Sequence, residues 1–156
     1  NSWQCDIYRR TCFYDCNKLQ KIKLSKKIQT INPYLLYGCS SLTEIEIPEG
    51  VKSIGYAAFS SCNKLTTITL PASLTSFNGT ALAGLSRLTE VKVADGNNSF
   101  KFENGILLSK DGKTMYMALL TLTEINVPNG VVSIVGDRYQ VLVQQKLYYQ
   151  IQLAQI

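Results

Sequence analysis

The sequence predicts a repeat solenoid, in which short parallel strands stack into a sheet on one face and turns form the other. Three observations predict it: a fixed period of 23 residues, apolar and polar residues that alternate within each copy, and proline and glycine at recurring positions. Residues 39–61 are the clearest copy. One such unit cannot bury its apolar face alone, whereas stacked copies bury a continuous core.

Each copy begins with a predicted strand. In residues 39–61, Ile45 and Ile47 alternate with Glu44 and Glu46. Alternation indicates a half-buried strand, because successive side chains point to opposite faces. Pro48 follows at once and should end the strand, since proline has no N–H to donate.

The second half of the copy predicts a return path. Glu49-Gly50 is typical of a turn, and Val51 and Ile54 are apolar residues three apart. Residues 56–59 form a short apolar patch, for which we expect one helical or 3₁₀ turn on the face opposite the strands. The copy then closes and the next one opens.

The same residue classes recur at intervals of 23. The aligned positions are Cys16, Cys39, Cys62 and Leu85; Leu19, Leu42, Leu65 and Leu88; Ile22, Ile45, Ile68 and Val91; Leu24, Ile47, Leu70 and Val93; and Phe13, Leu36, Phe59 and Leu82. These slots are expected to point inward and form the core.

These residues resemble the BspA-like leucine-rich repeats, whose pattern is roughly Cys-x-x-Leu-x-x-Ile-x-Ile-Pro-x-x-Val-x-x-Ile-Gly-x-x-Ala-Phe. Residues 39–59 match it almost slot by slot, and the resemblance covers about residues 8–139. It implies a leucine-rich-repeat horseshoe. Such repeats occur in surface proteins of host-associated bacteria and mucosal protist parasites, and members are implicated in adhesion to host cells and matrix proteins. The resemblance thus implies a cell-surface or extracellular location, and a cytoplasmic one stays open.

We expect one repeat domain over residues 1–156. Its predicted parts are a partial repeat (1–15), regular repeats (16–93), a repeat with a hairpin excursion (94–121), a last repeat (122–139) and an irregular cap or degenerate strand (140–156). The hairpin is predicted from two β-prone runs on either side of Asp111-Gly112. Because the chain begins inside a unit, without an apolar leader, we interpret it as a piece of a longer protein.

The chemical inventory argues against an enzyme. The chain has no histidine, and so lacks the commonest general base and zinc ligand. Glu44 and Glu46 could in principle form a catalytic pair, but we expect them on an open, solvated strand face without a cleft. A calcium loop beginning at Asp95 is rejected, because Ile106 stands where a bidentate glutamate is required. We predict no catalytic residue, cofactor or metal.

Cysteine positions separate into two groups. Cys16, Cys39 and Cys62 share the slot that Leu85 fills in the next copy, so we expect small buried apolar side chains there. Cys5 and Cys12 leave two alternatives open, free thiols or a bridge, which an extracellular location would permit. Asn78 and Asn97 head glycosylation sequons, which matter only in a secretory pathway.

The net charge of +5 arises from residues 1–30, where seven basic residues meet two acidic ones, 7 − 2 = +5. The basic residues are Arg9, Arg10, Lys18, Lys21, Lys23, Lys26 and Lys27, and the acidic ones are Asp6 and Asp15. This basic end could attract acidic glycans, anionic membranes or nucleic acid. Alternatively, it is a solvated end that discourages edge pairing.

The remaining candidate site is the exposed strand face. Its outward residues are predicted to be Lys21, Lys23, Glu44, Glu46, Thr67, Thr69, Glu90, Lys92, Glu124 and Asn126. Lys21 should face Glu44, and Lys23 should face Glu46. One interpretation is a solvated sheet face with cross-strand pairs. The other is a ligand surface, the usual role of a solenoid face.

We therefore predict a non-enzymatic binding module of a surface protein, which adheres through this face to a protein partner such as a host-cell or matrix protein. The alternative is a structural spacer without a ligand of its own. The face lacks aromatic side chains, which counts against nucleic-acid binding, and no apolar run is long enough for membrane insertion. The oligomeric state is left open.

Overall fold

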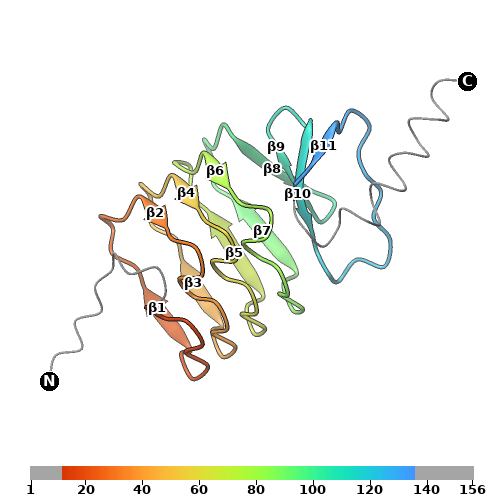
Figure 1. Ribbon diagram of the computed structural model, residues 1–156. Helices are drawn as coiled ribbons and strands as arrows, with labels where there is room; N and C mark the ends of the chain where they lie inside the picture. The colour runs from red at the N-terminus through yellow and green to blue at the C-terminus, as the bar shows by residue number, and fades with distance from the viewer. Residues whose placement is uncertain (1–11, 136–156) are drawn as a thin grey trace, which may run out of the picture.

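A computed structural model describes residues 12–135 and shows a solenoid with a period of 23 residues (Figure 1). Successive coils stack side by side along one axis. Two rows of short parallel strands run along the first four coils, and a hairpin-bearing unit follows them. Arg9, Arg10, Cys5 and the predicted cap at 140–156 lie outside the described residues.

The first row carries the predicted strand face. It consists of β1 (Lys21–Lys23), β3 (Glu44–Glu46), β5 (Thr67–Leu70) and β7 (Glu90–Val93). β1 pairs with β3, and β5 with β7, both in parallel. Paired residues are one period apart, as in Ile22 with Ile45 and Ile68 with Val91. The repeat predicted from the sequence is thus the register of the sheet.

A second row lies farther along each coil. It consists of β2 (Thr30–Ile31), β4 (Ser53–Ile54) and β6 (Ser76–Phe77), which form one parallel sheet. Thr30, Ser53 and Ser76 face one another across its strands. The apolar residue after each of them points inward.

The third side of each coil is made of turns, and the described residues contain no helix. The helical or 3₁₀ turn expected at residues 56–59 is therefore not formed. Tyr34 and Ala57 have left-handed backbones, with φ of 60° and 50°, which a right-handed helix does not accept. In addition, the Leu36 N–H donates to the Ala58 carbonyl at 2.9 Å. Backbone donors of these turns thus alternate between bonds to the next coil and bonds within the turn, such as the one from the Ser60 N–H to the Ala57 carbonyl at 3.2 Å.

The excursion forms a sheet of its own at the far end of the solenoid (Figure 1). Its strands are β8 (Phe100–Glu103), β9 (Ile106–Ser109), β10 (Thr114–Ala118) and β11 (Ser133–Ile134). β9 and β10 are antiparallel and form the hairpin predicted around Asp111-Gly112. β8, which was not predicted as a hairpin strand, pairs antiparallel with β9 through a turn at Asn104-Gly105.

Two clusters of buried side chains hold these parts together. The larger one runs through the first four coils, where Leu42 and Leu65 are fully buried. A smaller one, around Leu108, Met115 and Val131, joins the hairpin to the last repeat. Burial of each large aliphatic side chain contributes about 1.5–3 kcal/mol, so the stacked slots are the main source of stability.

The cysteine slot is buried as predicted at two positions. Cys39 and Cys62 are fully buried free thiols, and their S–H groups donate to the carbonyls of Phe13 (3.1 Å) and Leu36 (3.2 Å). Cys16 is free and half-buried. Burial, followed by the neighbouring thiol, raises the pKa of Cys39 to about 11 and that of Cys62 to about 12.

Cys12 is disulfide-bonded. Cys5, its candidate partner in the sequence, lies outside the described residues. Of the two alternatives, a free thiol is thus excluded for Cys12, and its bridge to Cys5 stays untested.

Asn97 is a polar residue in a slot that is apolar in the preceding coil. It occupies the slot of Leu74 but is a buried amide, only 2% exposed. Its Nδ2 donates to the carbonyls of Pro71 (2.8 Å) and Leu74 (3.2 Å), and its Oδ1 accepts from the N–H groups of Ser99 and Phe100. Every polar group of the amide is thus satisfied, and the amide nitrogen is not available for glycosylation in the folded chain.

Replacing Asn97 with alanine should destabilise the chain by about 3 kcal/mol, because buried backbone groups of two coils lose their partners. The matched control is Asn98→Ala, since Asn98 is the exposed neighbour and its loss should cost less than about 0.5 kcal/mol. Urea unfolding of both variants measures the difference. Equal midpoints for the two variants would contradict the role of Asn97.

The buried thiols should make stability fall at high pH. Their folded pKa values of about 11 and 12 lie above the ordinary value of 9.0, so the unfolded chain loses these protons first. The contribution is complete below pH 9 and is lost as the pH rises through 11 and 12. Thermal melts between pH 8 and 11 measure it. The decline should be shallower in Cys62→Val than in the natural sequence; an unchanged slope would refute this prediction.

Candidate protein-binding face

Eight of the ten predicted face residues lie on the four strands of the first row. They are Lys21, Lys23, Glu44, Glu46, Thr67, Thr69, Glu90 and Lys92. Seven are exposed and Thr67 is half-buried. Of the residues between them, Ile45, Ile68 and Val91 are buried and Ile22 is half-buried. We call these eight residues the strand face.

Charges on the strand face pair as the register requires. Lys21 Nζ lies 3.0 Å from Glu44 Oε2, which confirms the predicted cross-strand pair. Both side chains remain about 70% exposed, so the pair stabilises by less than about 1 kcal/mol. Lys23 is aligned with Glu46 as predicted, and Lys92 lies 3.6 Å from Glu90 on its own strand. These charges are solvated and accessible.

A small hollow lies beside the strand face, where β1 and β3 end. Lys23, Lys26, Glu46 and Glu49 line it together with Leu24 and Pro48, and its volume is about 170 Å³. Pockets that enclose a small molecule usually measure about 300–1,000 Å³. The hollow is therefore smaller than a typical pocket that encloses a small molecule.

Glu124 and Asn126 do not belong to the strand face, because residues 124–127 form no strand. Their predicted place there is wrong. The eleven added residues put β9 and β10 between the fourth coil and the last repeat. Strand β11 of the last repeat consequently pairs with β10, where Thr114 is aligned with Ser133. The first strand expected for this repeat does not pair with β7.

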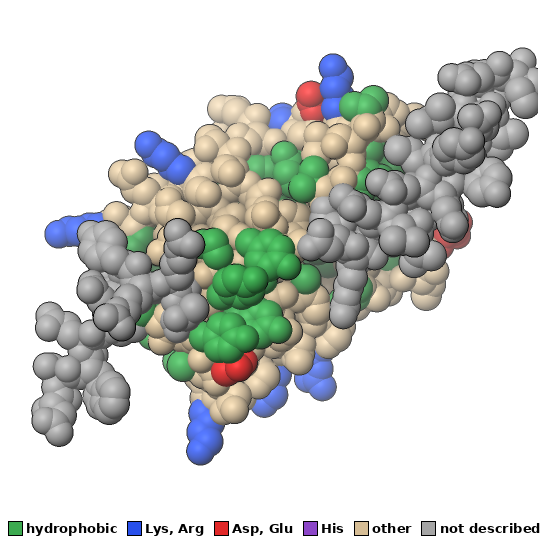
Figure 2. All heavy atoms as spheres, viewed as in Figure 1, with side chains coloured by type: hydrophobic (Ala, Val, Ile, Leu, Met, Phe, Trp, Pro, Cys, Tyr) green, Lys and Arg blue, Asp and Glu red, His purple; other side chains and the backbone are tan. Residues whose placement is uncertain are grey.

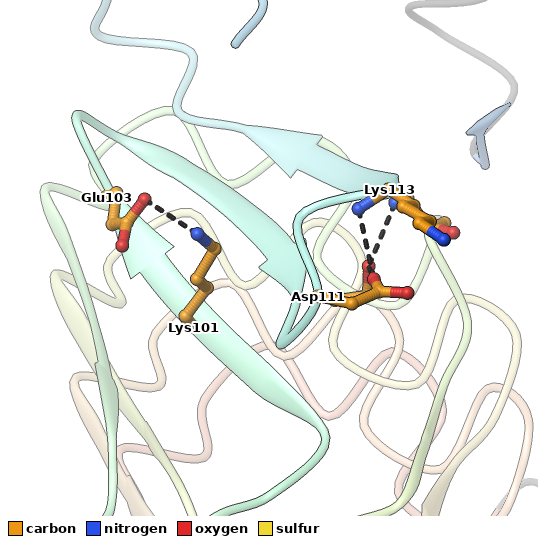
Figure 3. A network of polar contacts seen from close by, with 6 residues as sticks. Lys101, Glu103, Asp111 and Lys113 are labelled. Carbon is orange, nitrogen blue, oxygen red and sulfur yellow. Dashed lines mark hydrogen bonds and ion pairs between the residues drawn. The ribbon is translucent and has the colours of Figure 1, made fainter. Parts of the chain in front are cut away.

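The hairpin presents a second group of charges (Figure 3). On β8, Lys101 Nζ lies 3.2 Å from Glu103 Oε2. At the tip, Asp111 Oδ1 accepts hydrogen bonds from the Ser109 hydroxyl (2.6 Å) and the Lys113 N–H (3.0 Å). These bonds lower the pKa of Asp111. They fix the turn, which leaves Lys113 exposed to solvent.

The exposed basic end is only partly within the described residues. Its five described lysines, Lys18, Lys21, Lys23, Lys26 and Lys27, are all exposed. Across residues 12–135, no three acidic or cysteine side chains converge as a metal site would require. Over the same stretch, the chain has no helix long and apolar enough to cross a membrane.

The sequence analysis missed a group of tyrosines on the turn side of the coils. Tyr14, Tyr34 and Tyr56 are 37–46% exposed, and Tyr37 packs against Tyr14 and Tyr34. One signal was present in the sequence, since Tyr14 and Tyr37 are one period apart. We call these four residues the tyrosine cluster.

Comparisons with known proteins agree with this architecture. The family model for the BspA type leucine rich repeat region matches residues 6–140 in six copies. The structure resembles the pneumococcal vaccine antigen PcpA with a TM-score of 0.69, at 21% identity over 76% of this chain. At that identity the likeness shows the fold alone.

A second solved structure is a leucine rich cell surface protein from Faecalibacterium prausnitzii. It is 32% identical over 51% of this chain, with a TM-score of 0.50. The chain spans 30% of the PcpA structure and 21% of the Faecalibacterium one. No curated protein matches.

The register of the strands, the buried slots and the family match lead to the same conclusion. The family model covers most of the chain, and it covers all of the coils described above. The chain belongs to the BspA-type leucine-rich repeat family.

Proposed function

We propose that this chain is a non-enzymatic binding module of a surface protein, which adheres to a host-cell or matrix protein through the strand face. The observation that carries the proposal is the contrast between the two sides of each strand. Inward residues stay aliphatic and are buried or half-buried. Outward residues change from coil to coil, from two lysines to two glutamates, two threonines, and then glutamate and lysine.

A solenoid allows this contrast, because an outward side chain can change without disturbing the stacked core. The surface location is supported by the Faecalibacterium relative, which is described as a cell surface protein. The hollow beside the strand face, about 170 Å³, is small for a pocket that encloses a substrate, which favours contact with another surface. We treat residues 1–156 as one repeat domain within this proposal.

The double variant Thr67→Arg with Thr69→Arg tests the strand face. Both threonines lie on β5, in the middle of the row, so two arginines there should weaken binding to purified matrix proteins or cultured host cells by at least about tenfold. The melting temperature should change by only about 2 °C, since neither side chain is fully buried. The matched control is Thr121→Arg with Thr123→Arg, two exposed threonines away from the strand face.

Other outcomes would assign binding elsewhere. If binding survives the threonine variant but is lost when Lys110 and Lys113 are replaced by serine, the hairpin tip is the recognition element. If it falls steeply with salt and with loss of the basic end, that end is a nonspecific anion site. If the natural chain binds none of these partners, the module is a spacer.

A further inference from the structure

At the edge of the tyrosine cluster, the side chains in the same slots become small from one coil to the next. In the slot that begins at Tyr14, successive coils carry Tyr14, Tyr37, Ser60 and Ala83. In a second slot they carry Tyr34, Ala57 and Thr80. Large aromatic side chains on the first coils are thus followed by small ones on the next. We call the small residues Ala57, Ser60, Thr80 and Ala83 the shelf, and the neighbouring tyrosine rings the wall.

The rings of the wall support one another. Tyr14 stacks on Tyr37 with ring centroids 4.9 Å apart, and Tyr34 meets Tyr56 edge to face at 5.3 Å. Together with the small residues they line a shallow pocket of about 360 Å³. Its lining residues are Tyr14, Tyr34, Tyr37, Tyr56, Ala57, Ser60, Thr80 and Ala83. Figure 2 shows hydrophobic side chains gathered on an exposed face over the N-terminal half of the solenoid.

The pocket has a distinctive set of hydrogen-bonding groups. None of its lining residues is charged, and none carries a carboxylate or an amide side chain. The hydroxyl protons of Ser60 and Thr80 already form hydrogen bonds within the protein. Ser60 donates to the Ala83 carbonyl (2.8 Å), and Thr80 donates to Asn78 Oδ1 (2.6 Å). The four phenol hydroxyls have no hydrogen bond within the described residues. The pocket therefore offers aromatic faces and phenol hydroxyls that are free to donate, and its side-chain acceptors are hydroxyl oxygens alone.

We propose that this pocket binds a proline-rich peptide segment in the polyproline II conformation. Such a segment has no internal hydrogen bonds, so its carbonyls can accept from the tyrosine hydroxyls. Proline has no N–H and so needs no acceptor from the pocket. Its rings pack on aromatic side chains, and its stiffness reduces the entropy lost on binding. A sugar would instead bring many hydroxyl donors, and the lining has no carboxylate or amide side chain to accept from them.

This pocket is separate from the strand face. It is built from Tyr14, which precedes β1, and from the turns that follow β2, β4 and β6, whereas the strand face lies on β1, β3, β5 and β7. The inference therefore does not rest on the proposed function, and variants on either surface test one without the other.

A titration of the full 156-residue chain with decaproline tests the proposal. Amide chemical shifts of Tyr37, Ala57 and Thr80 should move and saturate, while those of β5 should not. A glycine-serine peptide of equal length should move none. Replacing Tyr37 with alanine should weaken binding at least about tenfold, because an aromatic anchor is lost.

Ala83→Tyr provides a variant that fills the shelf. The same slot holds tyrosine in the first two coils, so the chain should fold with a nearly unchanged melting temperature. Decaproline binding should be lost. Ala83→Ser is the matched control, since it keeps the residue small, and its affinity should stay within about twofold of the natural chain.

Two results would overturn the proposal. One is a natural chain whose shifts do not respond to decaproline. The other is a response of the same amides to cellohexaose, a neutral sugar, that Ala83→Tyr abolishes while decaproline has no effect. The pocket would then be a glycan site.

Discussion

Backbone hydrogen bonds between neighbouring coils are the interaction on which the rest of this structure depends. They pair residues one period apart in both rows of strands, as in Lys21 with Glu44 and Thr30 with Ser53. In the turns they join residues one short of a period apart, as in Leu36 with Ala58. Each such bond satisfies a buried group that a turn alone would leave unpaired. As a result, side chains of the same slot lie one above the other.

Stacked slots explain both the core and its exceptions. Aliphatic residues can fill a slot in every coil, and cysteine replaces them where its thiol reaches a carbonyl of the preceding coil. Asn97 shows how a polar residue can occupy the same kind of slot when all its hydrogen bonds are met. The hairpin then interrupts the period, and its strands supply the ladder on which the last repeat stacks. The inserted hairpin thus stands where a coil would otherwise stack, and the last repeat pairs with the hairpin strand β10.

Two surfaces result from this arrangement, and they differ in chemistry. The strand face is polar and mixed in charge, and its side chains alternate with the buried core. The tyrosine cluster is uncharged and lies on the turns, where a large side chain needs no place in the core. Because the two surfaces use different slots, the two proposed partners, a folded protein on the strands and an extended peptide on the turns, would not compete for the same residues.

The sequence by itself determined the period, the strand register, the buried cysteine slot, the Lys21–Glu44 pair and the hairpin around Asp111-Gly112. These features depend on residue type and spacing, which alternate or recur over short distances. Only the tertiary structure decided that residues 56–59 are not helical, since their N–H groups can pair with either their own turn or the next coil. It also decided that residues 124–127 form no strand, because a strand requires a neighbour and the hairpin had displaced it. The shelf beside the tyrosines was likewise hidden, since it depends on side chains of four coils meeting on one side.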